Sequence, residues 1–197
     1  MDVVEPWSGK KSVLEKDGTI HSAGDTVLGA DDISGILEIL YGVQLVLDSG
    51  KPHKKIEILF TIGEELYVKG SDVFDYSKVT AKQAYVLDLS EETTFNIGTI
   101  QGGTATNIVP DCCVLTAYET PLESKSVTDF QKACEILGFS GGLTGTFGGS
   151  DNNSFAKNGI EGLVLSNGMY NAHSTREYTT VDDLYKGAEL IGQLILL

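Results

Sequence analysis

The sequence predicts an α/β fold in which helices pack against a mainly parallel sheet. Two apolar runs, residues 56–62 and 84–87, have the composition and length of buried strands, and each is followed by carboxylates. A segment with helical spacing precedes the first run, and an amphipathic helix is predicted over residues 181–197. Strands that alternate with helices favour right-handed crossovers and therefore parallel pairing. A length of 197 residues suits one domain, or one domain with a small insertion.

The first 24 residues are polar and weakly periodic, with a hairpin turn predicted at residues 16–18. A helix follows over residues 34–47 and ends in turn-forming residues. Its buried face is marked by apolar residues at helical spacing, namely Ile36, Leu40, Val43 and Leu47. Asp31 and Asp32 precede this helix, where a carboxylate can cap the free backbone amides. One aspartate suffices for capping, so the second needs another explanation.

Carboxylates recur at the ends of the predicted strands. Glu64 and Glu65 follow the first apolar run, and Asp88 follows the second, with a short helix predicted between them at residues 70–74. A solvated acidic pair that ends a strand is the plainer interpretation of Glu64 and Glu65. Parallel strands, however, would bring these residues and Asp31 to one edge of the sheet, where ligands gather. Like charges this close need a bound cation or protonation.

The second half of the chain begins with a change of pattern. Short strands are predicted at residues 95–100 and 113–118, joined by turn residues, as in a β-rich insertion. Helical spacing returns over residues 126–137, and Asp151 is predicted to cap a further short helix. A last strand is predicted at residues 163–166.

His173 lies in the loop after that last strand, at the same kind of position as the carboxylates. A single histidine in a loop is more often a surface residue or a polar contact than a ligand. Together with Asp31, Glu65 and Asp88, it forms an oxygen-rich set with one imidazole. Such a set suits zinc, cobalt or manganese in a hydrolytic site better than a thiolate-based structural zinc site. Glu64 would then be left to act as a general base.

Composition excludes several kinds of partner. The net charge of −14 argues against nucleic acid and against an anionic membrane surface. No apolar run approaches the roughly 18 to 20 residues that a membrane span needs. The first residues lack the basic and apolar pattern of a secretory signal. Three cysteines without metal-binding spacing are typical of a reduced protein, so we expect a cytoplasmic location.

Six segments in order resemble the peptidase T branch of the zinc exopeptidases, a clan that also contains carboxypeptidase G and aminoacylase. The segments are residues 28–35, 63–65, 86–88, 102–111, 148–151 and 173–178. The resemblance covers nearly the whole chain and implies a three-layer α/β/α sheet with a β-rich lid insertion. Residues 1–90 and 121–197 would form the catalytic domain, and residues 91–120 would be a remnant of the lid or dimerisation domain.

The resemblance also implies roles for individual residues. Asp31 would bridge two metal ions, Asp88 would bind the first ion, and Glu65 and His173 would bind the second. Glu64 would take a proton from the attacking water and pass it to the departing amine.

Two departures from the family pattern modify this expectation. Residues upstream of Asp31 contain no His-x-Asp motif, which in the family supplies a ligand to the first ion. The first position would keep Asp31 and Asp88, with His21 as a candidate replacement, so we expect one tightly bound zinc ion. The lid segment is also short, but it contains Asn107, which would hold a substrate carboxylate or stabilise the oxyanion.

The expected function is metal-dependent removal of the amino-terminal residue from short peptides. One alternative is hydrolysis of another amide, such as an acyl amino acid. A second alternative is a non-catalytic remnant that binds one metal ion or none. The short lid and the absent upstream strand would expose sheet edge and apolar surface, so we also expect self-association into a homo-oligomer.

Overall fold

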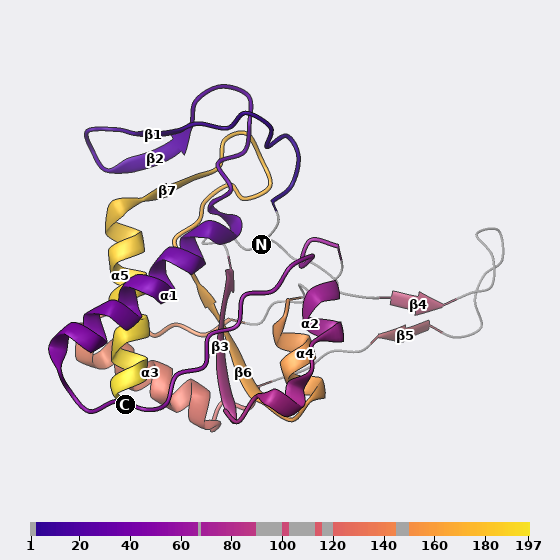
Figure 1. Ribbon diagram of the computed structural model, residues 1–197, viewed down its shortest axis with the longest axis vertical. Coiled ribbons are helices and arrows are strands. Elements are labelled where there is room, and N and C mark those ends of the chain that lie inside the picture. Colours follow the sequence, from indigo (N-terminus) through magenta and orange to yellow (C-terminus); the bar gives the residue numbers. More distant parts are fainter. Residues whose placement is uncertain (1–2, 67, 90–99, 103–112, 116–119, 145–149) are drawn as a thin grey trace.

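A computed structural model describes residues 3–66, 68–89, 100–102, 113–115, 120–144 and 150–197. In chain order its elements are β1 (Ser12–Leu14), β2 (Thr19–Ser22), α1 (Ala30–Ser49), α2 (Lys69–Val73), η1 (Tyr76–Lys78), β3 (Gln83–Leu89), β4 (Ile100–Gly102), β5 (Cys113–Leu115), α3 (Lys125–Leu137), α4 (Asn152–Lys157), β6 (Glu161–Ser166), β7 (Tyr178–Thr180) and α5 (Val181–Leu196). Figure 1 shows α1, α3 and α5 on one side of the β3–β6 pair, and α2 and α4 on the other. The predicted α/β architecture is confirmed.

The centre of the fold is the parallel pair of β3 and β6, in which Tyr85 lies opposite Leu163. Parallel pairing follows from the helices that connect the two strands, as the sequence predicts. The helices α3 and α5 bury apolar side chains against this pair. The resulting core cluster contains Leu87, Ala133, Leu165, Ile191 and Leu194.

The amino-terminal hairpin also forms as predicted. Strands β1 and β2 pair antiparallel, and Gly18 in the turn has a φ of 91°, which favours glycine. The sequence did not predict β7, which extends this pair to a three-stranded sheet with His21 opposite Tyr178. Three residues are too few to give a periodic signal.

The prediction of a strand at residues 56–62 is wrong. The structure has no strand between residues 51 and 61, and Ile58 and Phe60 are 43% and 44% exposed. This segment runs beside β3 in Figure 1, but a cavity of about 730 Å³ lies between them. The apolar run has the composition of a strand, yet within the described residues it has no strand to pair with. Pairing, which composition does not report, decides whether a strand forms.

The start of α1 contains a kink at the two aspartates. Gly29 occupies the N-cap position with a φ of 77°, and the helix start has no side-chain cap hydrogen bond. Asp31 and Asp32 have non-helical backbone angles and are joined by a cis peptide bond. Beyond this kink, the Asp32 side chain accepts a hydrogen bond from the backbone N–H of Gly35, as a capping aspartate does. The capping interpretation therefore holds for Asp32, and Asp31 is left for the site described below.

Strands β4 and β5 form a separate antiparallel pair in which Ile100 lies opposite Leu115. Figure 1 shows this pair to the right of the other elements. The rest of the strands predicted at residues 95–100 and 113–118 lies outside the described residues. That residues 91–120 are a remnant lid stays a prediction.

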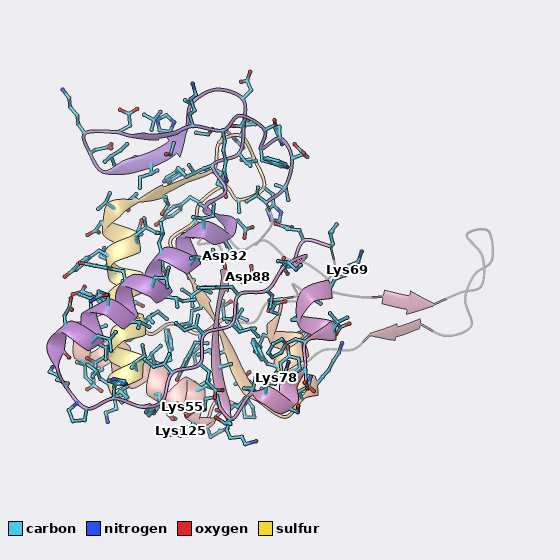
Figure 2. All side chains as sticks on the ribbon, in the orientation of Figure 1. Asp32, Lys55, Lys69, Lys78, Asp88 and Lys125 are labelled. Atoms are coloured by element: carbon cyan, nitrogen blue, oxygen red, sulfur yellow. The ribbon has the colours of Figure 1, made fainter. Side chains whose placement is uncertain are left out.

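Charged side chains are separated along β3. Figure 2 shows Asp32 and Asp88 near the carboxyl end of the strand, whereas Lys55 and Lys78 lie near its beginning. In the part of the chain that the structure describes, no helix has both the length and the apolar character to cross a membrane.

Candidate metal centre

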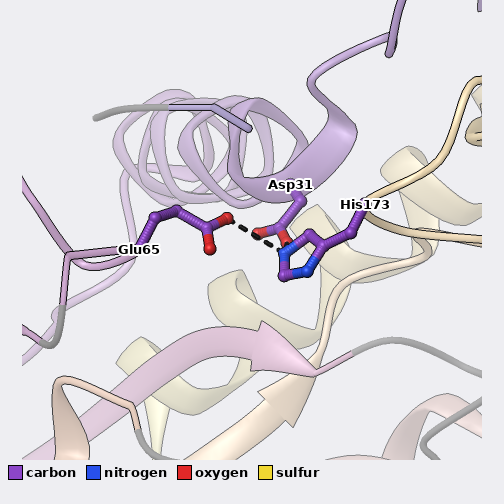
Figure 3. A group of neighbouring side chains, drawn as sticks. All are labelled: Asp31, Glu65 and His173. Atoms are coloured by element: carbon purple, nitrogen blue, oxygen red, sulfur yellow. Dashed lines mark ion pairs between the residues drawn. The ribbon is translucent and has the colours of Figure 1, made fainter. Parts of the chain in front are cut away.

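Three side chains from distant parts of the chain meet at the carboxyl end of the sheet. His173 Nε2 lies 2.7 Å from Asp31 Oδ2 and 2.9 Å from Glu65 Oε1 (Figure 3). One ligand atom from each residue can be chosen so that all lie within 4.8 Å of one another. Asp31 lies at the start of α1, Glu65 follows the segment beside β3, and His173 lies in the loop after β6. We refer to Asp31, Glu65 and His173 as the ligand group.

The ligand group is open on the side of the histidine. The side chains of Asp31 and Glu65 are 14% and 20% exposed, whereas that of His173 is 53% exposed. His173 has a φ of 62°, a left-handed conformation that is uncommon outside glycine. The site therefore combines two shielded carboxylates with an imidazole that faces solvent.

Hydrogen bonds from His173 to Asp31 and Glu65 raise the pKa of the imidazole to about 10. At neutral pH, the histidine is an imidazolium whose proton lies between the two carboxylates. A metal ion that binds the ligand group would take the place of this proton and its positive charge.

Two further aspartates beside the ligand group carry strongly perturbed pKa values. Burial, followed by the neighbouring charge of Asp31, raises the pKa of Asp32 to about 8. Burial, followed by the charges of Glu64 and Asp31, raises the pKa of Asp88 to about 9. These carboxylates accumulate more negative charge than the site can hold without protons. A bound cation would relieve this repulsion.

The predicted site residues differ in where the structure places them. Glu64 and Asp88 line the same cavity as Asp31 and Glu65, but Asp88 supplies no atom to the ligand group found among the described residues. Asn107 lies outside the described residues. Glu64 and Glu65 follow the segment beside β3, and Asp88 lies near the carboxyl end of β3. Asp31 lies at the start of α1, and these are the positions that the sequence indicates.

Two other polar residues had predicted roles: His21 as a replacement metal ligand and Asp151 as a helix cap. His21 forms an ion pair with Glu15 at 2.9 Å in the β1–β2 hairpin, and is not part of the ligand group. Asp151 occupies the N-cap position of α4 without a side-chain cap hydrogen bond. Its Oδ2 instead accepts a hydrogen bond from Thr61 Oγ1, and its side chain lines the cavity beside β3.

Sequence reasoning missed two residues that support the site. Glu177 is 2% exposed and accepts hydrogen bonds from the backbone N–H groups of Gly29 at 2.6 Å and Asp31 at 2.9 Å. Asn167 is 1% exposed and donates to Asp32 Oδ1 at 2.5 Å. Both residues lie in loops, where hydrophobic periodicity carries no information. Their closeness in sequence to His173 was the available signal.

The sequence profile of peptidase family M20/M25/M40 matches residues 1–197, the entire chain. The chain belongs to this family. One protein similar to this chain is YqjE of Bacillus subtilis strain 168, which is described as uncharacterized. The two sequences are 24% identical over 291 residues. The alignment covers 99% of this M20 chain and 78% of YqjE. Because the alignment is longer than the chain, YqjE contains residues within that span that have no counterpart here.

Within the M20 family, the chain is similar to peptidase T. It is 43% identical to peptidase T of Vibrio cholerae strain O395 over 70 residues, which are 35% of this chain and 17% of that protein. The crystal structure of aminopeptidase PepT from Bacillus cereus ATCC 10987 superposes with a TM-score of 0.82 at 24% identity. The superposition covers 98% of this chain and 78% of PepT. This likeness confirms the predicted exopeptidase-like fold.

Proposed function

We propose that this chain is a metal-dependent aminopeptidase of the peptidase T type, which releases the amino-terminal residue from short peptides. The meeting of Asp31, Glu65 and His173 at the carboxyl end of the sheet carries the proposal. Membership of a peptidase family and the similarity to peptidase T support it. We place the activity in the cytoplasm, with self-association of the chain as a further part of the proposal.

The ligand group fits a catalytic metal ion. Two carboxylates and one imidazole provide three protein ligands and leave an open position, as in many catalytic zinc sites. Zinc is the ion that we propose, with cobalt or manganese as alternatives of similar ligand preference. When bound, such an ion would lower the pKa of water and polarise the scissile carbonyl. Because Asp88 is not part of the ligand group, we propose one tightly bound ion.

Glu64 is the proposed general base. It adjoins Glu65 in sequence, lines the same cavity, and is close enough to Asp88 to raise the pKa of that residue. Its carboxylate would take a proton from the attacking water and donate it to the departing amine. Asn107, from the proposed remnant lid of residues 91–120, would hold a substrate carboxylate or stabilise the oxyanion.

Hydrolysis of a tripeptide with added zinc or cobalt tests this function. We expect wild-type activity and a loss of about 100-fold or more in Glu64→Ala, because general-base catalysis typically contributes that much. Zinc binding by the variant must remain, so that the loss reports on proton transfer. Glu135→Ala, at an exposed position on α3, is the matched control and should keep full activity.

Three results would contradict the proposal. Activity that survives in Glu64→Ala would remove this residue from the role of base. A wild-type protein that binds zinc but hydrolyses no tripeptide would favour the non-catalytic alternative. Hydrolysis of acyl amino acids in place of tripeptides would favour the other alternative, a different amide substrate.

A further inference from the structure

Three polar side chains of the loop after β6 contact the start of α1. His173 contacts the Asp31 side chain, and Glu177 accepts a hydrogen bond from the Asp31 backbone N–H (Figure 3 shows the first pair). The third is Asn167, the first residue after β6, which donates from Nδ2 to Asp32 Oδ1 at 2.5 Å. His173 and Glu177 thus contact a proposed ligand directly, whereas Asn167 contacts the residue next to it.

Asn167 donates two hydrogen bonds from its side-chain amide. Besides Asp32, its Nδ2 donates to Ser34 Oγ at 3.1 Å, and Ser34 Oγ donates to the backbone carbonyl of Ala30 at 2.5 Å. Asn167 and Ser34 are 1% and 2% exposed, so water does not compete for these contacts. An amide group supplies two donors, whereas an ionised carboxylate or an aliphatic side chain of similar size supplies none. The residue type at position 167 therefore matches its two acceptors.

Asp32 is also held from the side of the helix. Its carboxylate accepts a hydrogen bond from the backbone N–H of Gly35 in the first turns of α1. A β-carbon at residue 35 would collide with this carboxylate, so glycine is needed for the close approach. The Asp32 side chain is therefore fixed between Gly35 of α1 and Asn167 at the end of β6.

The position of Asp32 determines the position of Asp31. Adjacent residues share a rigid peptide plane, so a displacement of Asp32 moves the backbone of Asp31 as well. Asp31 Oδ2 lies 2.7 Å from His173 Nε2 in the ligand group. Because metal–ligand distances tolerate deviations of only about 0.2 Å, a small displacement of Asp31 would weaken the binding of an ion.

We propose that Asn167 is a positioning residue of the metal centre. By fixing Asp32 between β6 and α1, it directs the carboxylate of Asp31 toward Glu65 and His173. The inference rests on the proposed metal-dependent function, but it concerns how the ligand group is assembled and does not depend on turnover. Loss of the Asn167 amide should weaken metal binding although all three ligands remain.

Zinc affinity of Asn167→Leu tests this role. Leucine has a similar size and removes both donors, so we expect the affinity, measured by competition with a chromogenic chelator, to fall about 10-fold to 100-fold. Asn167→Asp should also weaken binding, although an added negative charge alone would strengthen it. This isosteric variant serves as the test if Asn167→Leu does not fold.

A matched asparagine provides the control. Asn158 donates from Nδ2 to the backbone carbonyl of Ser154 at 2.8 Å at the end of α4. Asn158→Leu removes an asparagine hydrogen bond of similar length that does not involve the start of α1. We expect this variant to keep the zinc affinity of the wild type.

The visible absorption spectrum of the cobalt-substituted protein separates positioning from a general loss of stability. Because the spectrum reports the geometry around the ion, its bands should shift in Asn167→Leu and remain unchanged in Asn158→Leu. Gly35→Ala displaces the Asp32 carboxylate from its other side, so it should cause a similar shift.

Hydrogen exchange in the metal-free protein tests whether Asn167 acts through Asp32. Asn167→Leu should accelerate exchange in residues 29–35, because the start of α1 loses a fixed point. In an Asp32→Ala background the amide has no carboxylate to hold, so Asn167→Leu should cause no further acceleration there. This measurement requires neither zinc nor substrate.

Four results would overturn the proposal. They are an unchanged zinc affinity in the Asn167 variants, a cobalt spectrum that these variants do not alter, additive effects on exchange in the Asp32→Ala background, and a wild type that binds no zinc. A wild type that binds zinc tightly but hydrolyses no tripeptide would contradict the proposed function alone, because none of these measurements depends on turnover.

Discussion

Glu177 Oε1 accepts a hydrogen bond from the backbone N–H of Asp31 at 2.9 Å, although 146 residues separate them. The other carboxylate oxygen accepts from Gly29. Glu177 lies four positions after His173, so one loop both contacts the Asp31 side chain and fixes its backbone. This arrangement holds two of the three proposed ligands in a defined relation before any ion binds, which is how outer contacts usually tune metal sites.

The first prediction concerns this buried carboxylate. In Glu177→Gln, an amide N–H₂ group would face a backbone N–H, so one of the two hydrogen bonds would be lost. We expect zinc affinity to fall about 10-fold to 100-fold, as is typical when a supporting contact of a ligand is removed. Competition with a chromogenic chelator measures the affinity. Glu135→Gln, on the exposed face of α3, is the control, and unchanged affinity in Glu177→Gln would refute the positioning role.

The second prediction is the number of bound ions. Zinc titration of chelator-stripped protein should reveal one tight equivalent, and zinc at 100 times its Kd should stabilise the fold by about 2.7 kcal/mol. The melting temperature of His173→Ala should respond much less to zinc. Two tight equivalents, or a melting temperature that zinc does not change, would be incompatible with the proposed single site.

The third prediction concerns stability of the metal-free protein. The pKa values of Asp32, Asp88 and His173 are raised in the folded state to about 8, about 9 and about 10. Each group binds its proton more tightly when folded, so its contribution to stability is lost as pH rises through the folded pKa. Urea unfolding should therefore show a decrease in the free energy of unfolding from pH 6.5 to pH 10. An increase over this range would contradict the raised pKa values of these three groups.

The fourth prediction is that removal of one acid stabilises the metal-free fold. Asp88→Asn replaces an acid whose pKa burial and the charges of Glu64 and Asp31 raise to about 9, so that it must take up a proton on folding at pH 8. We expect the free energy of unfolding at pH 8 to increase by on the order of 1 kcal/mol or more, because repulsion and desolvation are both relieved. Asp25→Asn, at an exposed position in the loop after β2, should have little effect. A destabilised Asp88→Asn protein would argue against the repulsion.

The sequence correctly predicted those helices and strands whose apolar pattern lies within their own residues. The helix over residues 126–137 has apolar spacing that matches α3, and residues 84–87 lie within β3. Residues 56–62 have an equally good pattern but form no strand, because a strand also depends on a partner elsewhere in the chain. The short strand β7 has too few residues for any pattern to appear.

Part of the candidate site could also be predicted from the sequence, because some of its residues lie next to predicted helices or strands. Asp31, Glu65 and His173 were selected because they follow strands or precede a helix, and the structure brings them within 4.8 Å. Their roles as ligands stay predictions. Glu177 and Asn167 were missed because their contacts depend on where loops meet, and a loop that contributes buried polar contacts has no periodic signature.

The ligand group draws on three segments that are far apart along the chain: the start of α1, the end of the segment beside β3, and the loop after β6. None of these segments can leave the folded structure without breaking the group. An ion bound there would have to dissociate before the protein could open, whereas it could join only after the segments had met. Zinc would thus act mainly on how slowly the protein unfolds, and very little on how fast it folds.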